Sequence, residues 1–158
     1  AFGNSNVSAL SLGGTSSYTF ETRMANILLS DATNTFTGRV GFLDSFSAEP
    51  TDGVYFRYSA ASANWVAVCR SNGVETVVDT TIAVSASAWA TFLVSVSAGS
   101  ATFYIDGVLR ATISTNIPTA VGRETGYGVA YIRSVGTAPI SVLRCDYLSL
   151  QVDLGNVR

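Results

Sequence analysis

The stretch Ala88–Ser114, AWATFLVSVSAGSATFYIDGVLRATIS, carries the clearest structural signal in the chain. Apolar and polar residues largely alternate along Trp89–Ser97, which is the period of a β-strand with one better-buried face. Ala98-Gly99-Ser100 and Asp106-Gly107 then mark two tight turns, and Asp-Gly suits a two-residue hairpin because both residues tolerate positive φ. We therefore predict a β-meander with strands at Trp89–Ser97, Thr102–Ile105 and Val108–Ile113.

The rest of the chain shows the same pattern of short strands. Further strands are predicted at Tyr18–Ser30, Phe36–Leu43, Val54–Ser59, Asn64–Arg70, Val74–Thr80, Thr81–Val84, Tyr127–Val135 and Ile140–Val152. Many short strands without a helical period are typical of a two-sheet sandwich. We predict an all-β antiparallel jelly roll in which 18–158 form a single domain with its long first and last strands paired. Residues 1–17 are predicted to form an N-terminal arm or edge strand.

Composition excludes several classes of partner. Of the 158 residues, 47% are hydrophobic and 13% are charged, which argues against disorder. All nine basic residues are arginine, they are scattered, and the net charge is −2, so nucleic-acid binding is not expected. The apolar runs are too short to cross a bilayer, so no membrane partner is expected.

The chain has two cysteines, Cys69 and Cys145, and both lie in strand-like segments. Cysteine often serves as a small apolar filler in such segments, so we favour free thiols over a disulfide. Without any histidine in the chain, a metal site built on these two cysteines is not expected.

Several segments carry a resemblance to a known family. Trp89 followed by apolar alternation and by Phe103-Tyr104-Ile105-Asp106-Gly107 resembles the concanavalin A-like (laminin-G-like) jelly-roll family. Four other segments resemble lectin-like domains of bacteriophage virion proteins. They are Arg39-Val40-Gly41-Phe42, Thr51-Asp52-Gly53-Val54-Tyr55-Phe56-Arg57-Tyr58, Ala63-Asn64-Trp65 and Thr115-Asn116-Ile117-Pro118-Thr119. The resemblance covers roughly Tyr18–Val152.

The resemblance implies a structural protein of the virion surface that is assembled in the host cytoplasm. We favour a lectin-like capsid decoration (cement) or head-fibre protein, because the chain shows no shaft or repeat. Its partners would be the major capsid protein or a fibre, and a homo-oligomer is expected because shells and fibres are symmetric. The alternative is a carbohydrate-binding receptor-recognition domain of a tail fibre or tailspike, which would bind host surface glycans.

Some jelly-roll relatives hydrolyse β-glucans with carboxylates in a Glu-x-Asp-x-x-Glu pattern on one strand. The chain lacks this pattern, since Glu21 stands alone on its strand and mostly apolar residues separate Glu75 from Asp79. It also lacks histidine and lysine for general-base or nucleophilic roles. We therefore expect a protein without enzymatic activity.

A sugar site needs an aromatic platform for the apolar face of the ring and planar donors for its hydroxyls. Two predicted strands joined by 60–63 bring such residues together. They are Trp65, Tyr55, Arg57, Tyr58, Asn64 and Arg70. The alternative is that Trp65 and one face of Val54–Ser59 belong to the core. Alternation does not decide which face is inside, so both interpretations stay open.

The loop that follows Leu43 carries Asp44, Glu49 and Asp52, whose carboxylates are of the kind that calcium binds. Their spacing matches no known loop motif. We favour acids that cap strand ends and expect no cofactor, with a structural calcium as the alternative.

The N-terminal arm offers apolar side chains to a neighbour. Phe2, Val7, Leu10 and Leu12 are the candidate subunit contacts. The alternative is that the arm pairs back onto its own sheet.

Overall fold

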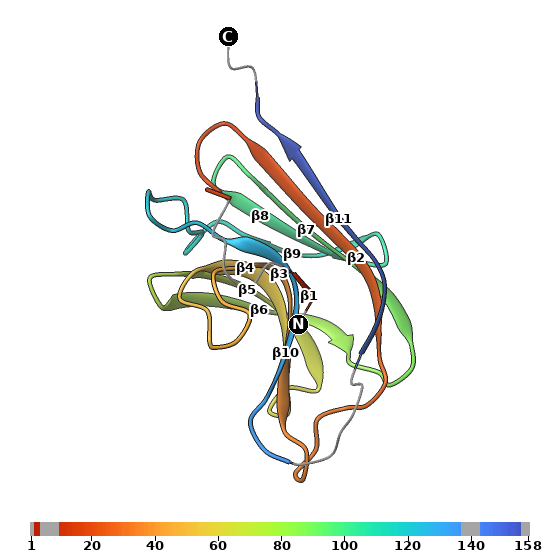
Figure 1. Cartoon of the computed structure of the whole chain (residues 1–158). Coiled ribbons are helices and arrows are strands. Elements are labelled where there is room, and N and C mark those ends of the chain that lie inside the picture. The colour runs from red at the N-terminus through yellow and green to blue at the C-terminus, as the bar shows by residue number, and fades with distance from the viewer. Residues whose placement is uncertain (1, 4–9, 137–142, 156–158) are drawn as a thin grey trace.

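The alternating pattern of the sequence is realised as two packed β-sheets. A computed structural model describes residues 2–3, 10–136 and 143–155, and within them the strands form two antiparallel sheets without a helix (Figure 1). The prediction of an all-β two-sheet jelly roll is therefore confirmed. Among the described residues, no helix is long and apolar enough to span a membrane.

One layer is a six-stranded sheet with the strand order β1-β10-β3-β4-β5-β6. Its strands are β1 (Phe2–Gly3), β10 (Gly126–Arg133), β3 (Phe36–Leu43), β4 (Gly53–Ser59), β5 (Asn64–Ser71) and β6 (Val74–Ala83). Both sheets bend in the same direction, and the six-stranded sheet lies on the inside of the bend (Figure 1). The outer face of this sheet, which points away from the other sheet, is therefore the concave side of the bent backbone (Figure 1).

The second layer is a five-stranded sheet with the strand order β11-β2-β7-β8-β9. Its strands are β11 (Leu143–Asp153), β2 (Ser17–Asn26), β7 (Trp89–Ser97), β8 (Ser100–Ile105) and β9 (Val108–Ile113). The long strands β2 and β11 pair antiparallel from Ser17↔Asp153 to Asn26↔Leu143, with an irregularity after Cys145. This confirms the predicted pairing of the long first and last strands.

The predicted meander is formed by β7, β8 and β9. At its two turns, Ala98 and Gly99 have φ of 48° and 77°, and Asp106 and Gly107 have φ of 52° and 74°. Positive φ at both central residues matches the right-handed twist of the flanking strands. The turn residues therefore set the register of these strands, which begins at Ser97↔Ser100 and Ile105↔Val108.

The predicted strands differ most from the structure at two places, and the other bounds that differ do so by one to three residues. The strand predicted to reach Ser30 ends at Asn26, where the chain leaves the sheet and the backbone carbonyl of Asn26 accepts the N–H of Ser87. The predicted strands Val74–Thr80 and Thr81–Val84 are a single strand, β6. Thr81 has φ of 61° and the pairing with β5 shifts there, so it forms an irregularity within the strand and does not end it.

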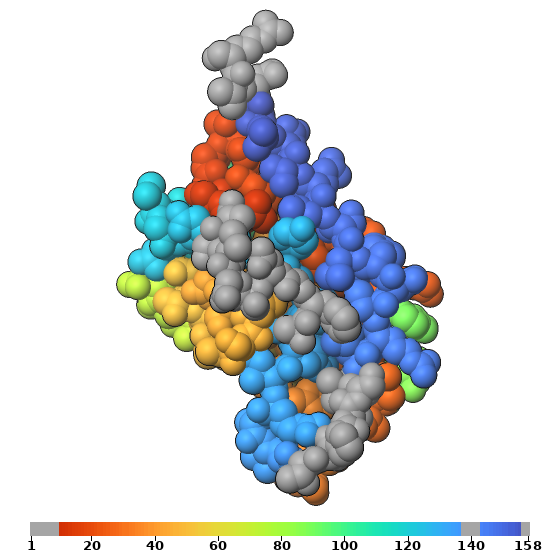
Figure 2. Space-filling model, in the orientation of Figure 1, coloured from red at the N-terminus to blue at the C-terminus, as the bar shows by residue number. Residues whose placement is uncertain are grey.

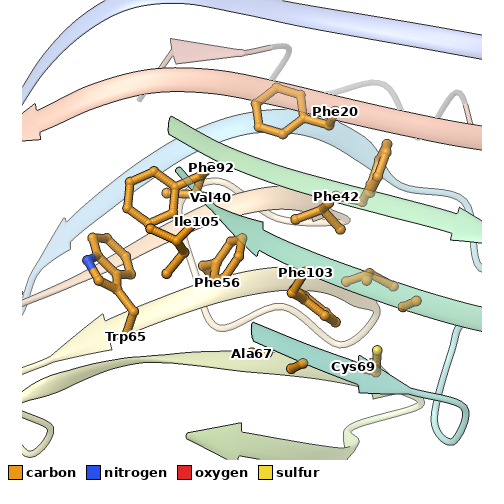
Figure 3. Close-up of a cluster of buried hydrophobic side chains, with 14 of the residues drawn as sticks. Phe20, Val40, Phe42, Phe56, Trp65, Ala67, Cys69, Phe92, Phe103 and Ile105 are labelled. Atoms are coloured by element: carbon orange, nitrogen blue, oxygen red, sulfur yellow. The ribbon is translucent and has the colours of Figure 1, made fainter. Parts of the chain in front are cut away.

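The core lies between the sheets and is rich in aromatic rings. The ring of Phe56 lies 5.3 Å from that of Phe92 and 5.3 Å from that of Phe103, in edge-to-face contacts (Figure 3). The ring of Trp65 lies 4.7 Å from that of Phe92 and joins the same cluster. These residues come from β4, β5, β7 and β8, so the inner faces of both sheets are tied together at this point.

Part of the N-terminal arm pairs with its own domain. β1 pairs with β10, Leu10 exchanges two backbone hydrogen bonds with Thr125, and Leu12 is buried in the core. Of the candidate subunit contacts, Leu10 and Leu12 therefore contact their own chain, Phe2 belongs to β1, and Val7 lies outside the described residues. The described part of the arm therefore pairs with strands of its own domain, which is the alternative to a subunit contact.

The two cysteines are free thiols, as predicted. Cys69 lies on β5 in the core, and burial raises the pKa of its thiol to about 12. Cys145 lies on β11 and is partly exposed.

Candidate functional site

The residues predicted to bind a sugar separate onto the two faces of the six-stranded sheet. Trp65 and Tyr58 point into the core, with 3% and 4% of their surface exposed and their rings 5.8 Å apart. They therefore form no platform on the sheet surface, in line with the alternative that assigned them to the core. The other four residues lie on the outer face. They are Tyr55, Arg57, Asn64 and Arg70.

A third arginine, Arg39 on β3, joins the outer face. Arg39 lies directly opposite Arg57 on β4, so two positive side chains are neighbours across the strand pair. Like charges at directly opposed positions destabilise a sheet. We call the set Arg39, Tyr55, Arg57 and Arg70 the arginine face.

Two glutamates bridge these arginines. Arg39 and Arg70 both donate to the carboxylate of Glu49, and the distance from Arg70 Nη1 to Glu49 Oε1 is 3.0 Å. Arg57 donates to both oxygens of Glu75, at 2.9 and 3.2 Å, and Arg70 also reaches Glu75 at 3.2 Å. The hydrogen bonds from Arg57 and the charges of Arg57 and Arg70 hold the pKa of Glu75 below its ordinary value, so this carboxylate stays ionised.

Loop 44–52, between β3 and β4, covers part of the arginine face. Phe46 of this loop packs with Tyr55 and with Leu43, Val68 and Ala130 in a small apolar cluster separate from the main core. Tyr55 is fully buried as a result. Its ring lies over Gly53, where a Cβ atom would come within 2.9 Å of the ring, so only glycine leaves room for it.

The covered part of the arginine face contains donors without acceptors. The Nε and Nη1 atoms of Arg39, the Nε of Arg70 and the hydroxyl of Tyr55 are buried and have no hydrogen-bond partner among the described residues. Arg39 is only 4% exposed. Burial raises the pKa of the Tyr55 phenol, which therefore stays protonated and able to donate. Such groups are rare in native structures, and each calls for an explanation such as an acceptor from outside the chain.

The base of loop 44–52 is held by its acids. The carboxylate of Asp44 accepts the N–H of Thr51 at 3.0 Å, and that of Asp52 accepts Asn72 N–H at 2.8 Å and Arg123 Nη1 at 3.0 Å. Figure 2 shows the loop (gold) at the surface beside the β5–β6 turn (yellow-green).

The three acids considered as calcium ligands do not converge. Asp44 and Asp52 cap the ends of the loop, whereas the carboxylate of Glu49 points to the arginines. Within the ranges that the structure describes, no group of three acidic, histidine or cysteine residues is placed to hold a metal ion.

Next to the arginine face, the outer surface toward β6 is open. Val66 on β5 is partly buried, and Val77 on β6 is exposed over 41% of its surface. The amide of Asn64 donates to both oxygens of Asp79, at 3.1 Å each. Apolar side chains thus lie beside amide, carboxylate and guanidinium groups on one face of the sheet.

Sequence reasoning did not assign Arg39 or Glu49 to this site. The available signal was the alternation of β3, which puts Arg39 on the face opposite to Val40 and Phe42. An arginine at such a position in an otherwise apolar strand indicates a special environment, because arginine is rarely buried without a partner. No local pattern connects Glu49 to Arg39, because the contact depends on how the loop folds back.

A family model described as "SO2946-like, C-terminal domain" matches residues 1–146. The chain belongs to this family. No curated protein matches it.

Solved structures show which fold this SO2946-like domain has. An alginate lyase from Corynebacterium sp. is 17% identical with a TM-score of 0.59, and the match covers 90% of this chain and 60% of the lyase. A β-1,3-glucanase from Mycobacterium marinum is 14% identical with a TM-score of 0.61, and the match covers 87% of this chain and 64% of the glucanase. Sheep galectin-11 in complex with glycerol is 11% identical with a TM-score of 0.53, and the match covers 85% of this chain and 89% of the galectin. This domain therefore spans less than two thirds of the two enzymes, and the likeness shows the fold alone.

These neighbours overturn the expectation of a protein without enzymatic activity, which was wrong. The fold of the SO2946-like domain is shared with polysaccharide lyases and a glucanase, and is thus an enzyme-like fold as much as a lectin-like one. The sequence argument failed because it tested one hydrolase pattern and a few residue types. One fold supports many arrangements of site residues.

Proposed function

We propose that this domain binds polysaccharide on the outer face of the six-stranded sheet, across the arginine face and the open surface beside it. The observation that carries the proposal is the set of buried guanidinium and hydroxyl donors without acceptors on that face. A polar ligand supplies the acceptors that the described residues do not. Planar guanidinium groups suit paired oxygen atoms, which saccharides present on neighbouring carbons.

The open surface supplies the remaining parts of a sugar site. The aliphatic side chains of Val66 and Val77 offer contact to the apolar faces of sugar rings, while Asn64 and Asp79 offer hydrogen-bonding groups for hydroxyls. The backbone of the sheet is concave on this side, which suits contact with an extended chain (Figure 1). In support, the alginate lyase and the β-1,3-glucanase with the same fold are proteins that act on polysaccharides.

The proposal is tested by titrating the domain with neutral and acidic oligosaccharides while following its amide and side-chain NMR signals. We expect the signals of Val66, Val77 and Tyr55 to shift on binding. Arg57→Gln should weaken binding by at least about tenfold, the equivalent of one lost charge-assisted hydrogen bond. Arg23→Gln, on the outer face of the five-stranded sheet, is the matched control and should bind as the unchanged protein does.

Two results would contradict the proposal. One is that no oligosaccharide shifts the signals of this face; the other is that Arg57→Gln and Arg23→Gln weaken binding equally. Assaying the same mixtures for new reducing ends determines whether bound polysaccharide is also cleaved.

The resemblance to phage proteins supports a second proposal about where the domain acts. We propose a location on a virion surface, as a capsid decoration, a head fibre or a receptor-recognition domain, with other virion proteins and host glycans as partners. Co-sedimentation with host envelopes, and in parallel with capsids that lack the protein, tests this. Sugar-competable binding to envelopes supports a receptor domain, saturable binding to capsids supports decoration, and binding to neither contradicts a virion location.

A further inference from the structure

The position of Glu49 indicates what kind of saccharide the arginine face accepts. Resting on the proposed function above, we propose that the ligand is an acidic saccharide, and that the carboxylate of one of its sugar rings replaces the Glu49 carboxylate between Arg39 and Arg70. In the structure described here, Glu49 acts as an internal substitute for the ligand.

The charges of the arginine face are not explained by the fold. Arg39 and Arg57 are directly opposed, which is unfavourable for the sheet, and they lie outside the main core. Three guanidinium groups face two carboxylates, Glu49 and Glu75, so the cluster is cationic in a chain whose net charge is −2. A cationic cluster on a sheet surface attracts an anion.

The two glutamates differ in how firmly they are held. Glu75 lies on β6 and receives hydrogen bonds from both terminal nitrogens of Arg57. Glu49 lies in the exposed tip of loop 44–52, and its side chain is 47% exposed, whereas the side chain of Arg39 is only 5% exposed. The Glu49 carboxylate can therefore turn into water, but Arg39 has to stay where it is.

We expect the exchange to begin at the Glu49 side chain, because the rest of its loop is held in place. Both ends of the loop are fixed through Asp44 and Asp52, and Phe46 and Pro50 are buried on either side of the tip. Rotation of the Glu49 side chain alone vacates the place between Arg39 and Arg70. An incoming carboxylate has the same charge and geometry as the group that leaves, so the bidentate acceptor that guanidinium prefers is retained.

The saccharide also offers what Glu49 lacks. Nε and Nη1 of Arg39, Nε of Arg70 and the hydroxyl of Tyr55 stay without acceptors among the described residues while Glu49 is in place. In a uronate, the ring oxygen and a hydroxyl oxygen lie within a few bonds of the carboxylate. They can therefore accept hydrogen bonds from donors beside those that hold the carboxylate. An acidic sugar therefore satisfies donors that a glutamate side chain leaves unpaired, which favours the exchange.

The test uses oligo-uronates and their uncharged esters. Tetrasaccharides of galacturonate, glucuronate and mannuronate, each also as its methyl ester, are titrated into the full chain by calorimetry. We expect at least one acid to bind about tenfold or more tightly than its ester, because the ester cannot replace a carboxylate between two arginines. Glu49→Gln should bind that acid about tenfold more tightly than the unchanged chain, since no carboxylate has to be displaced, and should bind the ester unchanged.

Asp146→Asn is the matched control, because it also removes one carboxylate that pairs with an arginine, Arg23, but lies on the five-stranded sheet, away from the proposed site. It should change acid binding far less than Glu49→Gln. Equal gains from the two variants would show a general effect of charge and overturn the exchange.

The failure of this inference differs from that of the proposed function. If acids and esters bind equally and Glu49→Gln changes neither, the inference is wrong while saccharide binding stands. If neither the uronates nor the neutral oligosaccharides bind, both are wrong. Circular dichroism of each variant confirms that it is folded.

Discussion

The two faces of β4 and β5 show how one pair of strands serves two purposes. The inner face carries Phe56, Trp65 and Cys69, which are buried against the five-stranded sheet. The outer face carries Arg57 and Arg70, which belong to a network of ion pairs. Adjacent residues of the same strand therefore have opposite roles, because successive side chains of a strand point to opposite sides.

This comparison assigns stability to the inner face and the proposed binding site to the outer face. The inner face excludes water and is stabilised by apolar burial and ring contacts. The outer face keeps buried donors unpaired and like charges opposed, arrangements that cost stability. The proposed binding of a saccharide to the outer face accounts for these features, which the fold itself does not require.

The largest expected effect on the free energy of unfolding comes from removing an aromatic ring of the inner face. Phe56→Ala removes the ring that contacts both Phe92 and Phe103 and should lower the free energy of unfolding by about 3–5 kcal/mol. Arg57→Gln, one position along the strand on the outer face, should lower it by no more than about 1 kcal/mol, because its ion pair is partly exposed. Urea denaturation of both variants measures this. Equal losses would contradict the division between the two faces.

A smaller effect is expected within the outer face. Glu49→Gln leaves the buried guanidinium of Arg39 without an anionic partner and should lower the free energy of unfolding by about 1 kcal/mol. In the Arg39→Met background the same change should cost nearly nothing, since no charge is left to pair. A double-mutant cycle by urea denaturation tests this coupling. If the two changes are additive, Glu49 and Arg39 do not depend on each other.

The smallest effect on stability is expected from labelling the thiols of the native protein. The labelling compares the accessibility of a core cysteine with that of a partly exposed one. With the pKa of Cys69 raised to about 12, only roughly one thiol in ten thousand is ionised at pH 8. Iodoacetamide should therefore label the partly exposed Cys145 in the native protein and Cys69 only after unfolding. Peptide mass spectrometry distinguishes the two sites. Fast native labelling of Cys69 would place it outside the core.

Most strands could be predicted from the sequence because they depend on local features. The bounds of β3, β7 and β9 match the predicted Phe36–Leu43, Trp89–Ser97 and Val108–Ile113. Glycine-containing turns such as Asp106-Gly107 set the hairpins, since few residues adopt positive φ at little cost. The merging of two predicted strands into β6 was missed, because the irregularity at Thr81 is accommodated by the partner strand β5.

The candidate site was predictable only in part. The structure places Tyr55, Arg57, Asn64 and Arg70 on one face of neighbouring strands, whereas Trp65 and Tyr58, which were grouped with them, face the core. The period of two is the same for both faces of a strand, so it cannot tell the inside from the outside. Because β4 carries aromatic residues on both faces, Tyr55 outside and Phe56 and Tyr58 inside, its sequence lacks the apolar–polar contrast that usually identifies the buried face.

Alternation and turn chemistry act over a few residues, so the class of fold and the hairpins could be predicted from the sequence alone. The pairing of the long first and last strands was predicted from the jelly-roll class and not from a local pattern. Only the tertiary structure decided which face of the six-stranded sheet packs against its partner, and that loop 44–52 folds back to place Glu49 between Arg39 and Arg70. That contact depends on the whole sheet being assembled, because β3 and β5, which carry the two arginines, meet only through β4.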